Sequence, residues 1–244
     1  MINFTFEENN RLTNDVNLCF IIEHALNKFV DTAEELMPTP TFDHLPEDKK
    51  ERIFSAAVKE FGQRNIMDAN LSNIVKDAKI ARGSIYQYFS TKEDLYIYVF
   101  DTLRARRAEY VNSAYELFKK APFLTFFQEF YLRDSEFLLL NPAHIELGKQ
   151  LYGCSSATSQ GLIRQIQNKY KEKFIIGIEY DKYRGIMDSH VDSAILADLC
   201  VHMVTDIFIF QSIYTQLSLS NLRYHCEQTM YLLEHGTKPR GEKE

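Results

Sequence analysis

Residues 71–94, LSNIVKDAKIARGSIYQYFSTKED, constrain the fold of this chain more than any other stretch of it. The apolar side chains of residues 71–78 recur at three- and four-residue spacing, which predicts a short amphipathic helix with Asn70 as its N-cap. A three-residue connection then leads to a second short helix over residues 82–89. Two short helices joined by a tight turn are the layout of a helix-turn-helix DNA reader.

Two neighbouring helices complete the core that this motif needs. Thr91 is suited to cap a helix that begins at Lys92, because acidic residues follow in the first turn, where the helix macrodipole favours them. Upstream, residues 47–63 carry apolar side chains at helical spacing, namely Ile53, Ala56, Ala57 and Phe61. We therefore expect the helix over 47–63 to close a three-helix core around the motif.

The segment from Lys49 to about Phe100 resembles the N-terminal DNA-binding domain of TetR/AcrR-family transcriptional regulators. The resemblance rests on IFSAAVKEFG and on NIVKDAKIARGSIYQYFSTKEDLYIYV, which is similar to the family pattern IA…AGVS.G.LY.HF..KE.L, and it covers about 50 of the 244 residues. Lys79 stands where the family has a turn glycine, so a positive φ there would strain the backbone. Ala81 replaces the usual serine at the start of the recognition helix and is a poor cap.

The resemblance implies a set of DNA-binding residues on and around the second short helix: Asn70, Ser72, Arg82, Gly83, Ser84, Tyr86, Gln87, Tyr88 and Lys92. Among them Arg82, Ser84 and Gln87 would read base edges, because Arg pairs bidentately with guanine and Gln with adenine. The other polar members would bind phosphates, the two tyrosines through their hydroxyls and Lys92, Asn70 and Ser72 at helix starts. Gly83 would let the backbone approach the groove closely.

The rest of the sequence predicts an all-α fold. From Lys92 onward apolar residues recur at helical spacing almost throughout, without an alternating strand pattern of useful length. We expect an N-terminal amphipathic helical extension over 1–45 and a helix-turn-helix DNA-binding domain over 46–100. A larger helical ligand-binding and dimerisation domain over 101–236 and a disordered tail over 237–244 would follow.

The N-terminal extension is longer than the family usually has. Its apolar residues predict a helix from Asn14 to about Met37, which Pro38 and Pro40 end. Such an amphipathic helix needs a partner surface. That surface is either the chain's own larger domain or the other subunit, or the extension is a docking segment for another protein or an acidic arm that tunes DNA affinity.

The distribution of charge agrees with DNA binding, although the formal net charge of the whole chain is −6. Residues 1–45 hold two basic and eight acidic residues, so the remaining residues balance. Within residues 62–92 there are five basic residues against two acidic ones. This local positive charge predicts salt-sensitive binding of a double-stranded DNA operator.

The resemblance also implies a homodimer built from the last two helices, over about 191–217 and 222–235. Their apolar residues would form the interface: Leu199, Met203, Ile207, Phe210, Tyr214, Leu222, Cys226, Met230 and Leu233. Two recognition helices about 34–36 Å apart can read a palindrome. The pattern therefore favours a regulator, by family habit a repressor, that binds a palindromic operator.

The helix over 122–140 is unusually aromatic, and in this family the larger domain holds a cavity for a small-molecule effector. A hydrophobic effector would suit a lining of Phe123, Phe126, Phe127, Phe130, Tyr131, Tyr152 and Phe174. Aromatic stripes at helical spacing are equally what a helical core requires. An effector would act by binding the DNA-incompetent arrangement more tightly.

Other classes of function have weaker support in the sequence. The four cysteines lie far apart without ligand spacing, which is typical of reduced thiols in a cytoplasmic protein, and no motif points to catalysis, a cofactor or a metal. No apolar run is long enough to span a membrane. Two alternatives remain: a metal- or haem-sensing regulator of the same fold, using His202 with Cys200 and Asp198 or His225 with Cys226, and an interaction module that has lost DNA binding.

Overall fold

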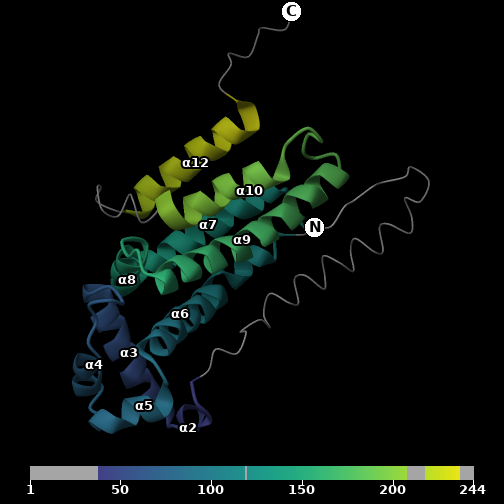
Figure 1. Cartoon of the computed structure of the whole chain (residues 1–244). Coiled ribbons are helices and arrows are strands. Elements are labelled where there is room, and N and C mark those ends of the chain that lie inside the picture. Colours follow the sequence, from purple (N-terminus) through teal and green to yellow (C-terminus); the bar gives the residue numbers. More distant parts are fainter. Residues whose placement is uncertain (1–37, 119, 208–217, 237–244) are drawn as a thin grey trace, which may run out of the picture. The chain divides into compact units, whose positions relative to one another are not determined.

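The computed structural model of the chain describes residues 38–118, 120–207 and 218–236. All regular elements in these ranges are helical (Figure 1), which confirms the all-α class. The predicted helix over 14–37 and the tail lie outside the described residues. The elements are α2 (Pro40–Asp43), α3 (Glu47–Gln63), α4 (Leu71–Asp77), a 3₁₀ turn η1 (Arg82–Ser84), α5 (Ile85–Tyr88), α6 (Lys92–Tyr115), α7 (Phe123–Leu140), α8 (Pro142–Tyr152), α9 (Ala157–Tyr183), α10 (Ser193–His202), a π-helical turn η2 (Met203–Ile207) and α12 (Leu219–His235).

The first helices form the small core that the sequence predicts. Helix α3 has the predicted bounds, and Thr91 and Asp94 make a reciprocal capping box at the start of α6. The apolar side chains of these helices meet in the middle, where Ile53, Ile74 and Leu95 are completely buried. Local signals therefore place α3, α4 and the start of α6, and their shared core presents α5 at the surface.

The helix-turn-helix core is attached to the larger helical part at two places. Helix α6 runs without a break over 24 residues, from the helix-turn-helix core into the larger part. Helix α3 also packs along α8, and a β-carbon at Gly62 would lie only 3.7 Å from backbone atoms of Ala143 and Leu147. Helices α6 and α8 therefore connect the helix-turn-helix core to the larger helical part (Figure 1).

Aromatic rings from α7 and α9 fill the core of the larger part. The side chains of Phe126, Phe127, Phe130 and Phe174 are all fully buried. Phe174 meets Phe127 edge-to-face with ring centroids 5.4 Å apart and Phe130 with centroids 5.9 Å apart. These geometries are those that aromatic pairs prefer, so the rings hold α7 and α9 together.

Two polar contacts fix α7 within this apolar surrounding. At its start, the Asp181 carboxylate on α9 accepts a hydrogen bond of 2.6 Å from the backbone N–H of Phe123 and one of 2.5 Å from Arg184. Further along, Asp134 forms a bidentate ion pair with Arg107 of α6. The Asp134 side chain is only 3% exposed, so the pair lies inside the core.

The last two helices differ from the sequence prediction. We predicted one helix over 191–217, but α10 ends at His202 and continues into the π-helical turn η2. The hydroxyl of Thr205 donates to the carbonyl of Val201 at 2.8 Å, a side-chain contact of the kind that competes with regular helix bonds. Within the described ranges, no helix is long and apolar enough to cross a membrane.

Candidate nucleic-acid interface

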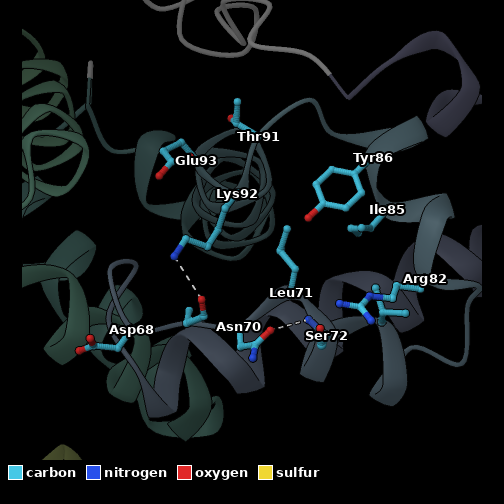
Figure 2. Close-up of a pocket in the computed structure, with 12 residues that line it drawn as sticks. Asp68, Asn70, Leu71, Ser72, Arg82, Ile85, Tyr86, Thr91, Lys92 and Glu93 are labelled. Carbon is cyan, nitrogen blue, oxygen red and sulfur yellow. Dashed lines mark hydrogen bonds between the residues drawn. The ribbon is translucent and has the colours of Figure 1, made fainter.

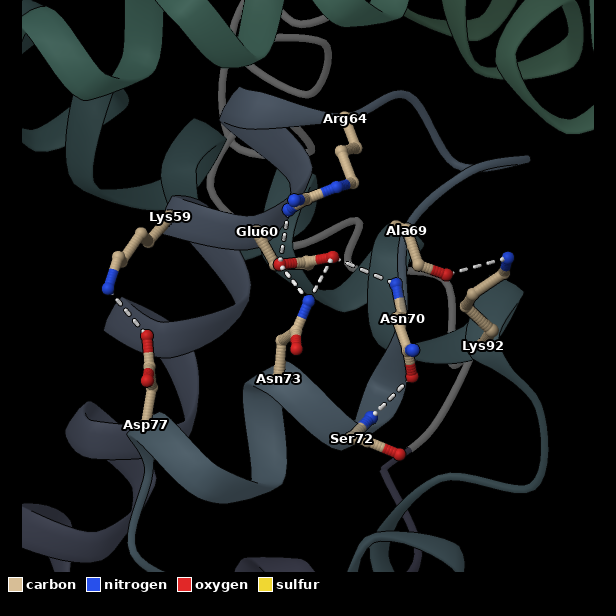
Figure 3. Close-up of polar contacts among 9 residues, drawn as sticks. All are labelled: Lys59, Glu60, Arg64, Ala69, Asn70, Ser72, Asn73, Asp77 and Lys92. Atoms are coloured by element: carbon tan, nitrogen blue, oxygen red, sulfur yellow. Dashed lines mark hydrogen bonds and ion pairs between the residues drawn. The ribbon is translucent and has the colours of Figure 1, made fainter.

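The start of α4 is held by its own cap and by a buried carboxylate. The Asn70 side chain accepts a hydrogen bond of 2.9 Å from the backbone N–H of Ser72, which confirms the predicted N-cap. Behind it, Glu60 of α3 accepts from the backbone N–H of Asn70 at 2.9 Å and from the side-chain amide of Asn73 at 3.1 Å (Figure 3). Arg64 pairs with the same carboxylate at 3.1 Å.

The sequence analysis did not identify Glu60 as part of this site. In the structure Glu60 is buried, with only 4% of its surface exposed. Its signal is its place on the apolar stripe of α3, four residues after Ala56 and three after Ala57. A carboxylate on a buried stripe must find donors, because an unpaired buried charge is strongly unfavourable. Here the donors belong to the start of α4, so Glu60 fixes that helix relative to α3.

The turn between α4 and the recognition helix contains a residue with positive φ, at the position where the family pattern has a glycine. Lys79 has φ 54°, the one non-glycine residue with positive φ in the described ranges. The turn is closed by a hydrogen bond of 3.2 Å from the backbone N–H of Ile80 to the carbonyl of Val75. The strain predicted for Lys79 is therefore present, and the turn keeps its geometry in spite of it.

Replacing Lys79 by glycine is expected to stabilise the protein by ~1 kcal/mol, because glycine adopts positive φ without a steric penalty. For a chain of this size that corresponds to a rise in the melting temperature of about 2–4 °C, measurable by thermal unfolding with circular dichroism. Lys76→Gly is the matched control, since it removes the same charge from the regular helix α4 and should destabilise by ~0.5–1 kcal/mol. Equal melting temperatures of the two variants would contradict strain at Lys79.

The recognition helix is shorter and less regular than predicted. We predicted one helix over 82–89, and the structure has the 3₁₀ turn η1 followed by a single turn, α5. Ala81 precedes η1 and gives no side-chain cap, as its apolar side chain requires. The outer face carries Arg82, Gly83, Tyr86 and Gln87, all exposed, while Ser84 is half-buried.

A groove of about 640 Å³ lies between the start of α4, the recognition helix and the start of α6 (Figure 2). Five of the predicted DNA-binding residues line it, namely Asn70, Ser72, Arg82, Tyr86 and Lys92. Gly83, Ser84 and Gln87 belong to the same recognition helix but do not line this groove. The sequence analysis missed the remaining lining residues Asp68, Ala69, Leu71, Val75, Ile85, Thr91 and Glu93.

Tyr88 does not lie on the outer face where the resemblance put it. Its side chain is only 4% exposed, and its ring packs against Phe42 with centroids 5.9 Å apart. The hydroxyl accepts a hydrogen bond of 2.9 Å from the ammonium of Lys49. Tyr88 follows Ile85 by three residues, so both face the core. We therefore withdraw Tyr88 as a phosphate contact.

Lys92 reaches the groove, but its ammonium already has partners. The Nζ atom donates to the backbone carbonyl of Met67 at 3.2 Å and to that of Ala69 at 3.1 Å; Figure 3 shows the contact with Ala69. These contacts tie the loop between α3 and α4 to the start of α6. Lys92 thus holds the walls of the groove, and a bound phosphate would share its ammonium with those carbonyls.

The positive charge of this face comes from few residues. Lys59 forms an ion pair of 2.6 Å with Asp77, and its hydrogen bond and charge lower the pKa of that carboxyl. Arg64 is paired with Glu60 as described above. In the part of the chain that the structure describes, no ion-pair partner is found for the exposed residues Lys76, Lys79 and Arg82. The charge available to a DNA phosphate is concentrated on these three.

The residues predicted to line an effector cavity lie in the core of the larger part. Phe123, Phe126, Phe127, Phe130, Tyr131 and Phe174 are buried, and Tyr152 is half-buried. The rings of the six buried residues contact one another, and a β-carbon at Gly177 would lie 2.8 Å from the Phe123 ring. The structure therefore shows the core role of these residues, and their effector role stays a prediction.

The predicted dimer-interface residues divide into two groups. Met203, Leu222, Cys226 and Met230 are buried within the chain itself, and α12 packs on α7, so these residues are not available to a partner. Leu199 is 50% exposed and Leu233 is half-buried. The side chains of Ile207, Phe210 and Tyr214 lie outside the described residues. The apolar side chains that α10 and α12 expose are Ile195, Leu199, Tyr224, Tyr231 and Leu232.

The thiols and histidines proposed for a metal or haem site do not gather into one. No group of three or more His, Cys, Asp or Glu side chains that could hold a metal ion occurs within the described ranges. Cys200 and Cys226 are buried and unpaired as disulfides. Burial raises the pKa of both thiols, that of Cys226 to about 12, so both are protonated at neutral pH.

A short helix presented by a tight turn, with an arginine and a tyrosine on its outer face, is how helix-turn-helix proteins meet the major groove, and this chain is a protein of that class. Residues 53–99 match the family of bacterial regulatory proteins, tetR family. These residues thus form a DNA-binding domain like that of TetR-family transcriptional regulators.

Relatives agree with this placement within the DNA-binding domain. The HTH-type transcriptional regulator HbdR of Aromatoleum sp. (strain CIB) is 33% identical over 66 residues, which are 27% of this chain and 29% of HbdR. The HTH-type transcriptional regulator YhgD of Bacillus subtilis (strain 168) is 32% identical over 69 residues, 28% of this chain and 36% of YhgD. The chain therefore spans about a third of the length of these curated relatives.

The likeness in fold extends further than the likeness in sequence. The transcriptional regulator FadR from Bacillus subtilis, solved in complex with stearoyl-CoA, superposes with a TM-score of 0.65. The superposition covers 78% of this chain and all of the FadR chain, at 18% sequence identity. At that identity the comparison shows a shared fold, including the larger helical part.

Proposed function

We propose that the chain is a transcriptional repressor that binds a palindromic operator as a homodimer and leaves it when a hydrophobic effector binds. The observation that carries the DNA-binding half is the groove beside the recognition helix, with Arg82 and Tyr86 in its lining. Tyr86 is 62% exposed, and Figure 2 shows its hydroxyl pointing into the groove. An exposed aromatic side chain next to an exposed arginine suits contact with a phosphate and a base edge.

Selection of bound duplexes from random DNA tests this half of the proposal. We expect enrichment of a palindrome whose half-sites are about one helical turn apart or a multiple of it. The affinity for the selected duplex should fall steeply with salt, because each neutralised phosphate releases counterions. A protein that enriches no sequence over the starting pool would contradict the proposed function.

The exposed apolar face of α10 and α12 supports the homodimer. The two helices are neighbours (Figure 1), and the Cys226 thiol of α12 helps to raise the pKa of the Cys200 thiol of α10. On their outer side Ile195 is 62% exposed and Tyr231 is 54% exposed. Monomeric proteins rarely leave such apolar side chains grouped on one face, and a self-complementary patch is how twofold dimers form. Here the outer residues, rather than the buried stripe of α12, would meet the partner.

Leu199→Glu is expected to convert the dimer into a monomer, because it places a charge in the middle of the proposed interface. Light scattering after gel filtration measures this directly. The selected duplex should then bind more weakly, since a monomer reaches one half-site only. Ile186→Glu is the matched control, because Ile186 is also 50% exposed but belongs to the loop before α10. A Leu199→Glu protein of unchanged mass in solution would rule out this face.

The larger part has an aromatic core that contains one ion pair. The ion pair of Arg107 and Asp134 lies next to the aromatic core of α7 and α9, and the half-buried Tyr170 lies close to both charges. Ligand sites are mainly apolar, with a few polar groups that fix orientation. We infer that an amphiphilic effector with an acidic end would displace rings in this core and turn that end toward Arg107.

Stearoyl-CoA is the first compound to test, because the FadR structure of the same fold contains it. Added to the complex of the protein with its selected duplex, it is expected to release the duplex in a concentration-dependent way. The release requires that the effector bind free protein more tightly than DNA-bound protein. Equal affinities for the two forms, measured by calorimetry, would refute release by this compound.

A further inference from the structure

The recognition helix is too short to be stable by itself. It consists of η1 over Arg82–Ser84 and α5 over Ile85–Tyr88, which together make about two turns. A helix of this length does not repay the cost of nucleation in water. Its last carbonyl groups also lack partners within the helix, as at every helix end. Contacts from elsewhere must therefore hold it.

Thr39 supplies these contacts at the C-terminal end. Its hydroxyl donates a hydrogen bond of 2.5 Å to the backbone carbonyl of Gln87. Its backbone N–H donates one of 2.9 Å to the carbonyl of Tyr88. One residue, about 50 positions upstream in the sequence, thus satisfies two carbonyls at the end of the recognition helix.

Phe42 anchors Thr39 in place. Its side chain is 2% exposed and its ring meets those of Tyr88, Phe89 and Tyr98, with centroids 5.9, 5.0 and 5.1 Å apart. In sequence, Thr39 stands between two prolines, which restrict its backbone before the contact forms. The helical turn α2 lies beside α5 as a result (Figure 1). The sequence predicts only that Pro38 and Pro40 end the preceding helix, and it does not predict this contact.

We propose that Thr39, which Phe42 anchors, positions the recognition helix for sequence readout by acting through Gln87. This inference rests on the proposed function, since it concerns how that DNA contact is made. The family match begins at residue 53, so segment 39–42 lies outside it.

The position of Gln87 makes the effect specific to base reading. A bidentate contact of Gln with adenine needs two aligned hydrogen bonds, so a small shift of the backbone at residue 87 removes it. Phosphate contacts are less demanding, because long side chains and a diffuse charge tolerate such shifts. Loss of the Thr39 contact should therefore weaken binding of the selected duplex more than binding of a scrambled duplex of the same length and composition.

Thr39→Val tests the proposal, because it keeps the shape of the side chain and removes its hydroxyl. We expect the affinity for the selected duplex to fall about 5- to 10-fold and that for the scrambled duplex to change less than about 2-fold. Thr39→Ser should restore binding, since it restores the donor. Thr41→Val is the matched control, because Thr41 is exposed in the same segment and its loss should change neither affinity. Melting temperatures measured in parallel identify any variant that has lost its fold.

A double-mutant cycle shows whether Thr39 acts through Gln87. In the Gln87→Ala background, Thr39→Val should have no further effect on the selected duplex. Equal losses in both backgrounds, or equal losses on selected and scrambled duplexes, would overturn the positioning role. If the wild-type protein selects no sequence at all, the proposed function fails. If it selects one and Thr39→Val binds it like the wild type, only the role of segment 39–42 fails.

Discussion

Replacing Arg82 by alanine is expected to lower the affinity for the selected duplex roughly 30-fold or more. Arg82 is exposed at the start of the recognition helix and lines the groove. One bidentate arginine–guanine contact provides ~1–3 kcal/mol of discrimination, and a homodimer makes it twice. The sum of ~2–6 kcal/mol corresponds to losses from about 30-fold upward, measurable by fluorescence anisotropy with labelled duplex.

Two further variants separate base reading from charge. Arg82→Lys keeps the positive charge but cannot make the bidentate contact. It should therefore restore the affinity for the scrambled duplex but not that for the selected duplex. Arg164→Ala removes an exposed arginine of α9, which is not part of the helix-turn-helix motif, and should bind both duplexes like the wild type. If Arg82→Ala also binds like the wild type, the recognition helix is not the part of the chain that meets DNA.

The parts of the site that follow from local rules could be predicted from the sequence. The bounds of α3, the Asn70 cap and the capping box of Thr91 depend on residues within a few positions of one another. The strain at Lys79 is likewise a property of one backbone position. These features were correct because nothing distant in the sequence competes with them.

The parts that depend on distant partners could not be predicted. Thr39 and Glu60 form hydrogen bonds with groups 48 and 10 residues away in the sequence. The residues next to them in the sequence do not indicate which groups these are. The buried stripe of α12 shows the same limit, because an apolar pattern says that a face is covered but not what covers it. Helix α7 of the same chain covers Leu222 and Cys226, where the resemblance implied a second subunit.

Asp134→Ala is expected to lower the free energy of unfolding by ~3–5 kcal/mol, because it leaves the guanidinium of Arg107 without its carboxylate inside the core. The two side chains are 18% and 3% exposed, so water cannot replace the lost partner easily. Urea denaturation followed by circular dichroism measures the change. Glu116→Ala is the control, since its pair with Lys120 has side chains 73% and 71% exposed and its loss should cost less than ~0.5 kcal/mol.

Removing both charges should restore stability. In Arg107→Met/Asp134→Leu, apolar side chains of similar volume occupy the same space, and such replacements of buried ion pairs are often neutral or stabilising. A double variant as unstable as Asp134→Ala would mean that packing, and not the unpaired charge, explains the loss. Asp134→Ala losing less than ~1 kcal/mol would mean that the pair is solvated in the folded protein.

The same double variant separates a structural role of the pair from a role in effector binding. If the pair serves stability alone, the folded double variant should bind the selected duplex and be released by stearoyl-CoA like the wild type. If Arg107 holds the acidic end of the effector, DNA binding should persist, while the concentration of stearoyl-CoA needed for release should rise at least about tenfold. A rise of this size corresponds to the loss of one hydrogen bond to a charged group. We expect the second result, because an ion pair is not needed for stability at a site where apolar side chains serve as well.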